Sequence, residues 1–209
     1  MSEILEKIRE AKAKAKPRKF VQTWDLIISL KNIDLKKPEN RINLDFTLPE
    51  GRGKQMKTVF IVDSISVGPK KDVAVIKKEE LEELAKNKKK LKKMVNEYDH
   101  WFAEAPLMTL IAKTLGPVLG PRNKMPRPIP PGGKIEPFIE IANKTVKIRL
   151  KDSPVIHVPI GTENMKEEQI AKNAESVYNF IKDKLPKGVA NIKSVHIKLT
   201  MGPAIKIKM

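Results

Sequence analysis

The stretch "TVKIRLKDSPVIHVPIG" (Thr145–Gly161) decides how this chain is organised. Its two halves, "TVKIRL" and "VIHVPIG", are short and rich in β-branched residues, which is typical of strands. Strands are also predicted near the start of the chain, whereas the residues between have strands alternating with helices. The return of the β pattern at Thr145 therefore predicts that both ends of the chain build one unit, with a second unit inserted between them.

The first 64 residues predict one helix followed by strands. The helical spacing of residues 2–16 ends at Pro17. "INLDFTL" (Ile42–Leu48) alternates, and we expect it to pair antiparallel with the preceding strand. "TVFIV" (Thr58–Val62) predicts a buried strand. That preceding strand lies in "FVQTWDLIISL", whose apolar residues share one parity: Phe20, Trp24, Leu26, Ile28 and Leu30.

The last part of the chain predicts a long helix and a final hairpin. Residues 164–186 form a strongly amphipathic helical pattern that ends at Pro186. "KSVHIKLT" (Lys193–Thr200) alternates, "MGP" (Met201–Pro203) predicts a turn, and "AIKIKM" alternates again. These elements supply the second half of the β-rich unit.

The middle of the chain has an α/β pattern. It predicts a strand at 73–76, one helix over 77–98, a short strand at 100–105 and further helices over 106–116 and 135–142. Strands that alternate with helices are typical of an α/β layer.

We therefore predict an α+β protein of two domains. Residues 1–64 and 145–209 form a discontinuous domain of antiparallel sheet plus helix, and residues 65–144 form an inserted α/β domain, expected to move on connections near Ser64 and Lys144. The discontinuous domain has 26 basic and 15 acidic residues, and the insert has 16 and 10. Both domains therefore carry a positive charge.

The net charge of +17 favours a polyanion as partner. Lysines and arginines that neutralise phosphates release the counterions condensed on a nucleic acid. A heavily charged thermophile-like surface would explain the 32% of charged residues but not their imbalance. An anionic membrane surface is the least favoured partner. No apolar run approaches the about 20 residues that span a bilayer, so we expect no transmembrane segment.

Composition also limits the chemistry. The chain has no cysteine, and its three histidines are scattered, so we expect no disulfide, no metal site and no cofactor. The N-terminus is too charged for a signal peptide, so we expect a soluble cytoplasmic protein. No Ser/His/Asp arrangement or isolated carboxylate pair points to a catalytic residue, and we expect no enzyme.

The stretch "TLGPVLGPRNKMPRPIPPGG" (Thr114–Gly133) has two interpretations. A glycine-rich turn at a helix start can bind phosphate through its N–H groups. Its prolines, however, remove many of these donors, and the spacing matches no known phosphate loop. A rigid loop that closes a helix is therefore favoured, while Arg122, Lys124 and Arg127 leave contact with backbone phosphates open.

The C-terminal hairpin is a second candidate site. Alternation places Ser194, His196, Lys198 and Thr200 on one polar face, and the Thr200 hydroxyl can contact a ribose 2′-OH or a phosphate. An ordinary hairpin with a solvated face explains the pattern equally well. Phe20 beside the basic run "KAKAKPRK" could stack on a base, although a core position is the more usual one.

Five blocks of sequence, in order, resemble the universal ribosomal protein L-one family, the stalk protein of the large ribosomal subunit. The most specific is "LGPVLGPRNKMPRP". The others are "RKF" near residue 20, "TLPEGRGK" at 47–54, "IHVPIG" at 156–161 and "SVHIKLTMGP" at 194–203. The resemblance covers nearly the whole chain, and the cysteine-free composition, rich in Lys, Glu and Ile, resembles archaeal members.

The resemblance implies the inserted architecture, with a Rossmann-like insert that has no nucleotide site. It implies a protein, monomeric when free, that binds large-subunit ribosomal RNA at the mobile stalk near the tRNA exit site and assists release of deacylated tRNA. It also implies repression of translation through the protein's own mRNA. The RNA-binding residues carried over are Glu10, Lys19, Phe20, His157, Ser194, Thr200, Met201, Gly202 and Pro203. Where bacterial members are rich in threonine, this chain has His196, Lys198 and Leu199.

Two other functions stay open at this point. One is a nucleotide-using enzyme with its site in the α/β insert, which a nucleotide titration would reveal. The other is a general basic protein of chromatin type, which competition with unrelated DNA would test.

Overall fold

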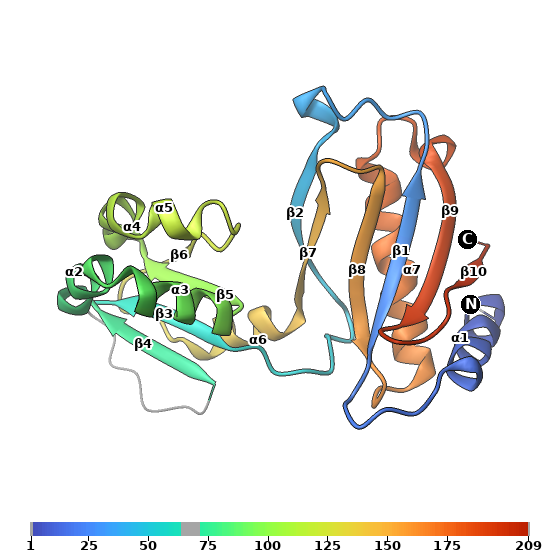
Figure 1. Ribbon diagram of the computed structural model, residues 1–209, viewed down its shortest axis with the longest axis horizontal. Helices are drawn as coiled ribbons and strands as arrows, with labels where there is room; N and C mark the ends of the chain where they lie inside the picture. The colour runs from blue at the N-terminus through green and yellow to red at the C-terminus, as the bar shows by residue number, and fades with distance from the viewer. Residues whose placement is uncertain (1, 64–71, 209) are drawn as a thin grey trace. The chain divides into compact units, whose positions relative to one another are not determined.

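The computed structural model describes residues 2–63 and 72–208, apart from the side chains of Ser2 and Ala85 (Figure 1). Contacts divide the chain into two compact units, Met1–Lys54 with Asn143–Met209 and Gln55–Ala142. We call them the discontinuous unit and the inserted unit. The fold is of mixed α+β type, with several sheets and helices.

The discontinuous unit is built on a four-stranded antiparallel sheet with the order β10-β9-β1-β8. The strands are β1 (Thr23–Leu30), β8 (Val155–Thr162), β9 (Ile192–Leu199) and β10 (Ile205–Ile207). As predicted, residues of one parity in β1 are buried, while those of the other parity lie on the outer face of the sheet.

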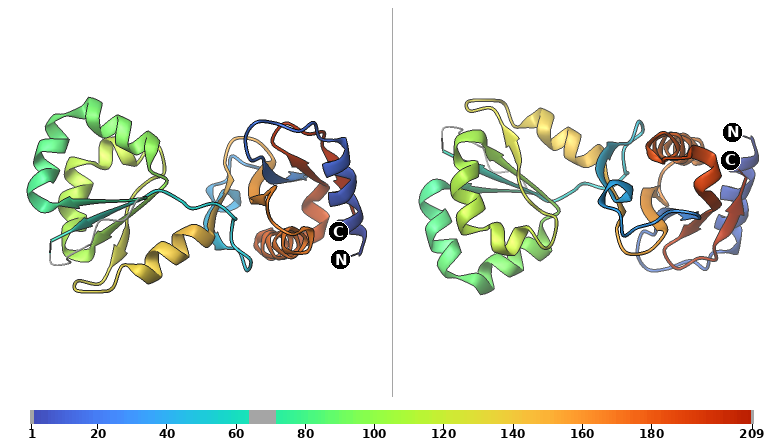
Figure 2. Two further views of the ribbon diagram at one scale, coloured as in Figure 1. Left: turned by 90° about the horizontal axis from the view of Figure 1, so that it is seen from below. Right: turned by 90° about the horizontal axis from the view of Figure 1, so that it is seen from above.

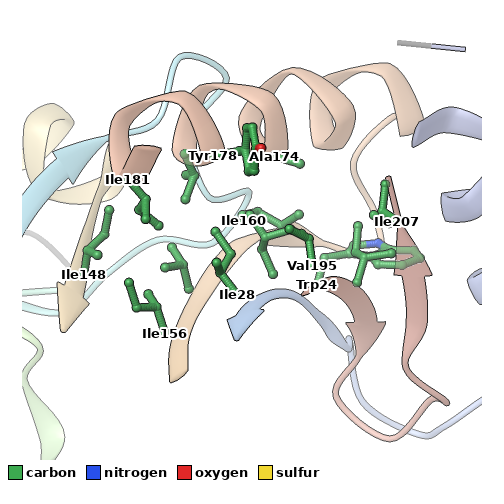
Figure 3. Packing of buried hydrophobic residues seen from close by; sticks show 14 of the residues in the cluster. Trp24, Ile28, Ile148, Ile156, Ile160, Ala174, Tyr178, Ile181, Val195 and Ile207 are labelled. Atoms are coloured by element: carbon green, nitrogen blue, oxygen red, sulfur yellow. The ribbon is translucent and has the colours of Figure 1, made fainter. Parts of the chain in front are cut away.

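Two helices cover the inner face of this sheet. They are α1 (Ser2–Lys14) and α7 (Glu167–Lys184), which pack against each other. Figure 3 shows α7 above the sheet, with apolar side chains filling the space between them. This burial supplies the main stabilisation of the unit and fixes α1 against β9 and β10.

A second antiparallel pair joins β2 (Ile42–Thr47) to β7 (Thr145–Leu150). The predicted pairing of the "INLDFTL" segment with β1 is therefore wrong, because β8 and β9 already occupy both edges of β1. The predicted burial of one parity is also wrong in part, since Leu44 is 40% exposed. Phe46 instead packs on Phe180 of α7, with ring centroids 4.7 Å apart.

The inserted unit contains a parallel sheet with the order β4-β3-β5-β6. Its strands are β3 (Thr58–Val62), β4 (Val73–Lys77), β5 (His100–Glu104) and β6 (Arg127–Ile129). Both faces are covered, as is usual for parallel strands. Figure 2 shows helices on the two sides of the sheet.

The helices of the inserted unit pack on the two faces of the sheet through two separate apolar clusters. One cluster joins one face of the sheet to four helices, and the other joins the opposite face to α6 (Glu136–Lys144). The four are α2 (Lys78–Lys86), α3 (Lys88–Glu97), α4 (Met108–Thr114) and α5 (Gly116–Leu119). Short 3-10 turns lie at Pro38–Asn40, Ala105–Leu107 and Gly188–Asn191.

Two details differ from the sequence-based expectations. The sequence predicts the Thr58–Val62 strand within the discontinuous domain, but β3 pairs with β4 on one side and β5 on the other, so it belongs to the inserted sheet. The first boundary of the compact units thus follows Lys54, and the predicted one at Ser64 lies outside the described residues. The second follows Ala142, two residues before the predicted one at Lys144.

The single helix predicted over 77–98 is two helices, α2 and α3. They are separated at Asn87, whose side-chain oxygen accepts a hydrogen bond from the Lys90 amide at 3.1 Å. Asparagine is a preferred N-cap because this bond satisfies a donor of the first helical turn. The apolar periodicity continues through Asn87, which is why the pattern alone indicated one helix.

Candidate RNA-binding surface

The turn after β9 is fixed to the start of β1 by Thr200. The Thr200 amide donates to the Thr23 carbonyl at 3.0 Å. The Thr200 hydroxyl donates to the same carbonyl at 3.2 Å and accepts from the Thr23 amide at 3.1 Å. These three bonds extend the β1–β9 pairing by one residue and hold the turn, Thr200–Pro203, in one position.

The Thr200 hydroxyl keeps one free acceptor site. A hydroxyl has one donor and two acceptor lone pairs. Thr23 uses the donor and one lone pair, and the side chain is exposed. Thr200 can therefore accept a hydrogen bond from a ligand, such as a ribose 2′-OH, but it donates inward.

Gly202 brings the turn close to the end of α1. A Cβ atom at Gly202 would lie 3.3 Å from Cβ of both Ala15 and Leu199. Its φ lies outside the left-handed region, so close approach and not backbone conformation is what favours glycine here. The 200–203 turn is thus packed against the segment that leads from α1 to β1.

That segment carries Lys19 and Phe20, and both are exposed. Phe20 is 52% exposed and Met201 is 56% exposed, which is unusual for large apolar side chains. The core position considered for Phe20 is wrong, because β1 begins only at Thr23 and the parity of its inward residues does not extend to Phe20. An exposed aromatic ring beside a lysine suits stacking on a base next to a phosphate.

We call Lys19, Phe20 and Thr200–Pro203 the corner surface. Thr200, Met201 and Pro203 are exposed and Gly202 is half-buried. The structure thus brings six of the nine residues expected to bind RNA to one corner of the discontinuous unit.

Glu10 lies on α1, before the corner surface. Its carboxylate accepts from Lys7 Nζ at 2.8 Å and from Lys14 Nζ at 2.6 Å. The hydrogen bond from Lys14 and then that from Lys7 lower the pKa of Glu10 to about 2. The carboxylate is therefore ionised and flanked by two cations, so this part of α1 has no net negative charge.

Ser194 and His157 lie away from the corner, on the outer face of the sheet. Ser194 is opposite Ser29, and His157 is opposite Ile27. Ser194 is six residues from Thr200 along β9, a distance of about 20 Å at the usual rise of a strand. A ligand that contacts all nine predicted residues would have to extend over the sheet face as well as the corner.

Asp25 lies on the same outer face, opposite Lys198 of β9. Burial raises the pKa of the Asp25 carboxyl, and the charges of Lys198, His157 and Arg52 oppose that shift. Lys198 thus lies opposite the one carboxylate that β1 places on this face and offsets its negative charge toward an anionic ligand.

The Gly-Pro stretch folds differently from the loop expected there. Gly116 and Pro117 begin the short helix α5, which packs on α3. Lys124 Nζ donates to the carbonyls of Val95 and Tyr98, each at 2.7 Å, and burial lowers its pKa. Lys124 therefore caps the carboxyl end of α3.

Arg122 makes similar contacts with α3. It donates to the Lys92 carbonyl at 3.4 Å and to the side-chain oxygen of Asn96. Two of the three cationic side chains considered for phosphate contact thus bind the inserted unit itself, and the third, Arg127, lies on β6.

Sequence reasoning missed two residues beside the corner, Gln22 and Thr23. Thr23 supplies the backbone partners of Thr200, and Gln22 is buried, with 1% exposure. A signal was present for Gln22, because it has the parity of Trp24 and Leu26, the inward residues of β1. A glutamine at an inward position predicts a buried amide that needs hydrogen-bond partners.

Within residues 2–63 and 72–208, no three His, Asp or Glu side chains gather where they could hold a metal ion. No helix in this part of the chain is long and apolar enough to cross a membrane.

Residues 10–203 match the ribosomal protein L1p/L10e family. The chain is 50% identical to large ribosomal subunit protein uL1 of Thermococcus kodakarensis, over 98% of this chain and 96% of that protein. It is 49% identical to the protein of the same name in Pyrococcus abyssi, over 98% and 95%. For Methanothermobacter thermautotrophicus the identity is 44%, over 98% of each chain. The chain belongs to the ribosomal protein L1p/L10e family.

Proposed function

We propose that the discontinuous unit binds large-subunit ribosomal RNA through the corner surface, with further contacts along α1 and the outer face of the sheet. The chain is a protein of the large ribosomal subunit and not an enzyme. Its family is one of ribosomal proteins, and the relatives that it matches over nearly their whole length are large-subunit ribosomal proteins. A nucleotide-using enzyme in the insert is therefore excluded.

One observation supports the corner as the RNA site. The backbone of the 200–203 turn is held by Thr23, while the groups that face outward are a free hydroxyl lone pair, a lysine and two large apolar side chains. Such a rigid surface can recognise folded RNA by shape, by 2′-OH groups and by stacking. No part of the turn would have to become ordered on binding, which limits the entropic cost.

The test compares two exposed apolar residues of the discontinuous unit. Phe20 and Val189 are both 52% exposed, but only Phe20 belongs to the corner surface. With a fragment of the stalk ribosomal RNA from the same cell, Phe20→Ala should weaken binding by about 1–3 kcal/mol, the usual range for loss of one stacked base. Val189→Ala should bind like the wild type, and equal effects of the two changes would contradict the assignment.

The assignment also includes the residues outside the corner. Glu10, His157 and Ser194 are proposed to contact the parts of the RNA that extend over α1 and the sheet face. Footprinting of the bound RNA in the presence of Ser194→Ala would check this extension, since protection should be lost at a position distinct from that affected by Phe20→Ala.

Finer roles are proposed from the family resemblance. The bound RNA would form the mobile stalk near the tRNA exit site, with the Rossmann-like inserted unit carried on its two connections and release of deacylated tRNA assisted. The same corner would bind the protein's own mRNA and repress its translation. A reporter carrying the native leader should be repressed by the wild type and not by Phe20→Ala, and added ribosomal RNA fragment should relieve the repression.

A further inference from the structure

A buried glutamine lies directly behind the corner surface. Gln22 Nε2 donates to the Lys16 carbonyl at 3.4 Å, and Gln22 Oε1 accepts from the Met201 amide at 3.2 Å. Lys16 follows α1, and Met201 is the second residue of the 200–203 turn. One side-chain amide thus joins the two segments that build the corner.

The backbone of Gln22 is fixed from a third segment. Its amide donates to Oε2 of Glu163 at 3.3 Å, and its carbonyl accepts from the Glu163 amide at 2.9 Å. Glu163 lies between β8 and α7 and is the titratable side chain in contact with Gln22. The glutamine is therefore held in place independently of the two groups that its side chain binds.

The polarity of the partners allows only one orientation of the Gln22 amide. The Met201 N–H can only donate and the Lys16 carbonyl can only accept, so the oxygen must face Met201 and the nitrogen Lys16. A residue at this position therefore has to present one acceptor and one donor at the two ends of a planar group of this length.

We propose that Gln22 is the positioning residue for RNA recognition at the corner surface. It sets the distance between the Lys19–Phe20 segment and the 200–203 turn through the Lys16 carbonyl and the Met201 amide, without touching RNA itself. The inference rests on the proposed function, because it assigns to Gln22 the geometry of that same site.

Two substitutions separate positioning from general stability. Gln22→Met keeps the length of the side chain and removes both hydrogen bonds. Gln22→Glu keeps the acceptor for Met201, but at neutral pH it places a carboxylate oxygen against the Lys16 carbonyl in a buried position. When the introduced carboxyl is protonated, its O–H can donate to Lys16 while its C=O accepts from Met201, which restores the pattern of the amide.

The experiment measures affinity of the full chain for the stalk ribosomal RNA fragment, relative to the wild type at each pH. We expect Gln22→Met to weaken binding about tenfold at every pH, as loss of a buried hydrogen-bonded pair would. Gln22→Glu should bind weakly at pH 7 and approach the wild type as pH falls. Unfolding of each variant is measured at the same pH values, because protonation of a buried carboxylate relieves destabilisation as well. Affinity losses that only follow the unfolded fraction, or no recovery in acid by folded Gln22→Glu, would overturn the proposal.

A matched control is Gln169→Met. Gln169 is a half-buried glutamine that also accepts from a backbone amide, that of Lys166 at 3.1 Å, and donates at 3.4 Å to Glu50, but it has no bond to the corner. Gln169→Met should leave RNA affinity unchanged. Equal losses from Gln22→Met and Gln169→Met would overturn the positioning role.

A double-mutant cycle checks the partner through which Gln22 acts. If Gln22 positions Phe20, the effect of Phe20→Ala should be smaller in Gln22→Met than in the wild type, whereas additive effects would overturn the proposal. If Gln22→Met does not fold, the same cycle with Gln22→Glu, read at pH 7, decides the matter. Wild-type protein that does not distinguish stalk RNA from an unrelated duplex would overturn the proposed function itself, a result distinct from those above.

Discussion

The corner surface and the Gly-Pro stretch both carry a Gly-Pro step and nearby cationic residues. In the Gly-Pro stretch cationic side chains bind the protein itself, whereas at the corner a cationic side chain stays exposed. In the Gly-Pro stretch, Lys124 and Arg122 donate to carbonyls around the end of α3. At the corner, Thr23 and Gln22 satisfy the backbone of the turn, and Lys19 stays exposed.

The difference shows that a loop motif and its function need not coincide. The Gly-Pro stretch is the most distinctive part of the sequence, but in the structure its Arg122 and Lys124 side chains bind groups of the inserted unit. The plain segment from Lys16 to Thr23 is what carries and supports the exposed residues of the corner. The distinguishing property is whether the protein itself already satisfies the polar groups.

The largest effect should come from filling the close approach at the corner. Gly202→Val would place a branched side chain against Ala15 and Leu199, where even a Cβ atom lies at 3.3 Å. We expect a loss of about 2–3 kcal/mol in the free energy of unfolding, as for an overpacked site. RNA affinity should fall more than tenfold, because the turn and the end of α1 move apart.

Ala204→Val is the control for this change. Ala204 is exposed and lies two residues further along the chain. Ala204→Val should alter neither denaturant unfolding nor RNA binding. If Gly202→Val binds and unfolds like Ala204→Val, the close contact with α1 has no role.

The next largest effect should come from the Gly-Pro stretch, where Lys124 binds the end of α3. Lys124→Met removes two hydrogen bonds to the end of α3, and we expect the unfolding free energy of the inserted unit to fall by about 1–2 kcal/mol. Affinity for stalk RNA should not change. Lys113→Met on α4 is exposed and provides a control for loss of charge alone.

Thermal unfolding and RNA titration of both lysine variants distinguish the two interpretations of the Gly-Pro stretch. Normal unfolding of Lys124→Met together with weaker RNA binding would mean that the stretch is an RNA site after all.

Much of the fold follows from periodicity, and the exceptions have identifiable causes. The alternation of β1 and the long stripe of α7 predicted both elements, because burial of one face controls them. The partner of β2 was not predictable, since alternation says which face is buried but not which strand edge is free. The break at Asn87 was hidden because its cap interrupts the backbone while the apolar spacing continues.

The candidate site was predictable only through family resemblance. Composition indicated a nucleic acid, and alternation placed Ser194 and Thr200 on a polar face. Neither could show that the segment carrying Lys19 and Phe20 is joined to the turn, because the hydrogen bond between Gln22 and Met201 links residues 179 positions apart. Gln22 itself gave a local signal, an amide at an inward position, but its partners are backbone groups that no sequence pattern reveals.

A smaller effect should come from Thr200. Thr200→Val removes the remaining lone pair and both hydroxyl bonds to Thr23. We expect a loss of about 1 kcal/mol in RNA binding, and a similar loss in unfolding free energy because the Thr23 amide loses a partner. Thr200→Ser keeps the hydroxyl and should restore both quantities in the same titrations. Wild-type binding by Thr200→Val would mean that the hydroxyl does not contact RNA.

The smallest effect should come from single exposed charges, and it compares the two units directly. Lys206 lies on β10, opposite His196 on the outer face of the sheet, whereas Lys113 lies on α4 of the inserted unit. If RNA lies on that sheet face, Lys206→Ala should make the negative slope of log affinity against log salt less steep by roughly 0.7–0.9, the value for one phosphate contact. The same loss is expected on an unrelated duplex, because a phosphate contact carries no sequence information. Lys113→Ala should leave the slope for stalk RNA unchanged. Equally reduced slopes for the two variants would mean that the charge of the whole protein attracts RNA without a preferred face, and RNA binding would then have to be assigned to the inserted unit as much as to the discontinuous one. An unchanged slope for Lys206→Ala would mean that RNA does not contact this lysine.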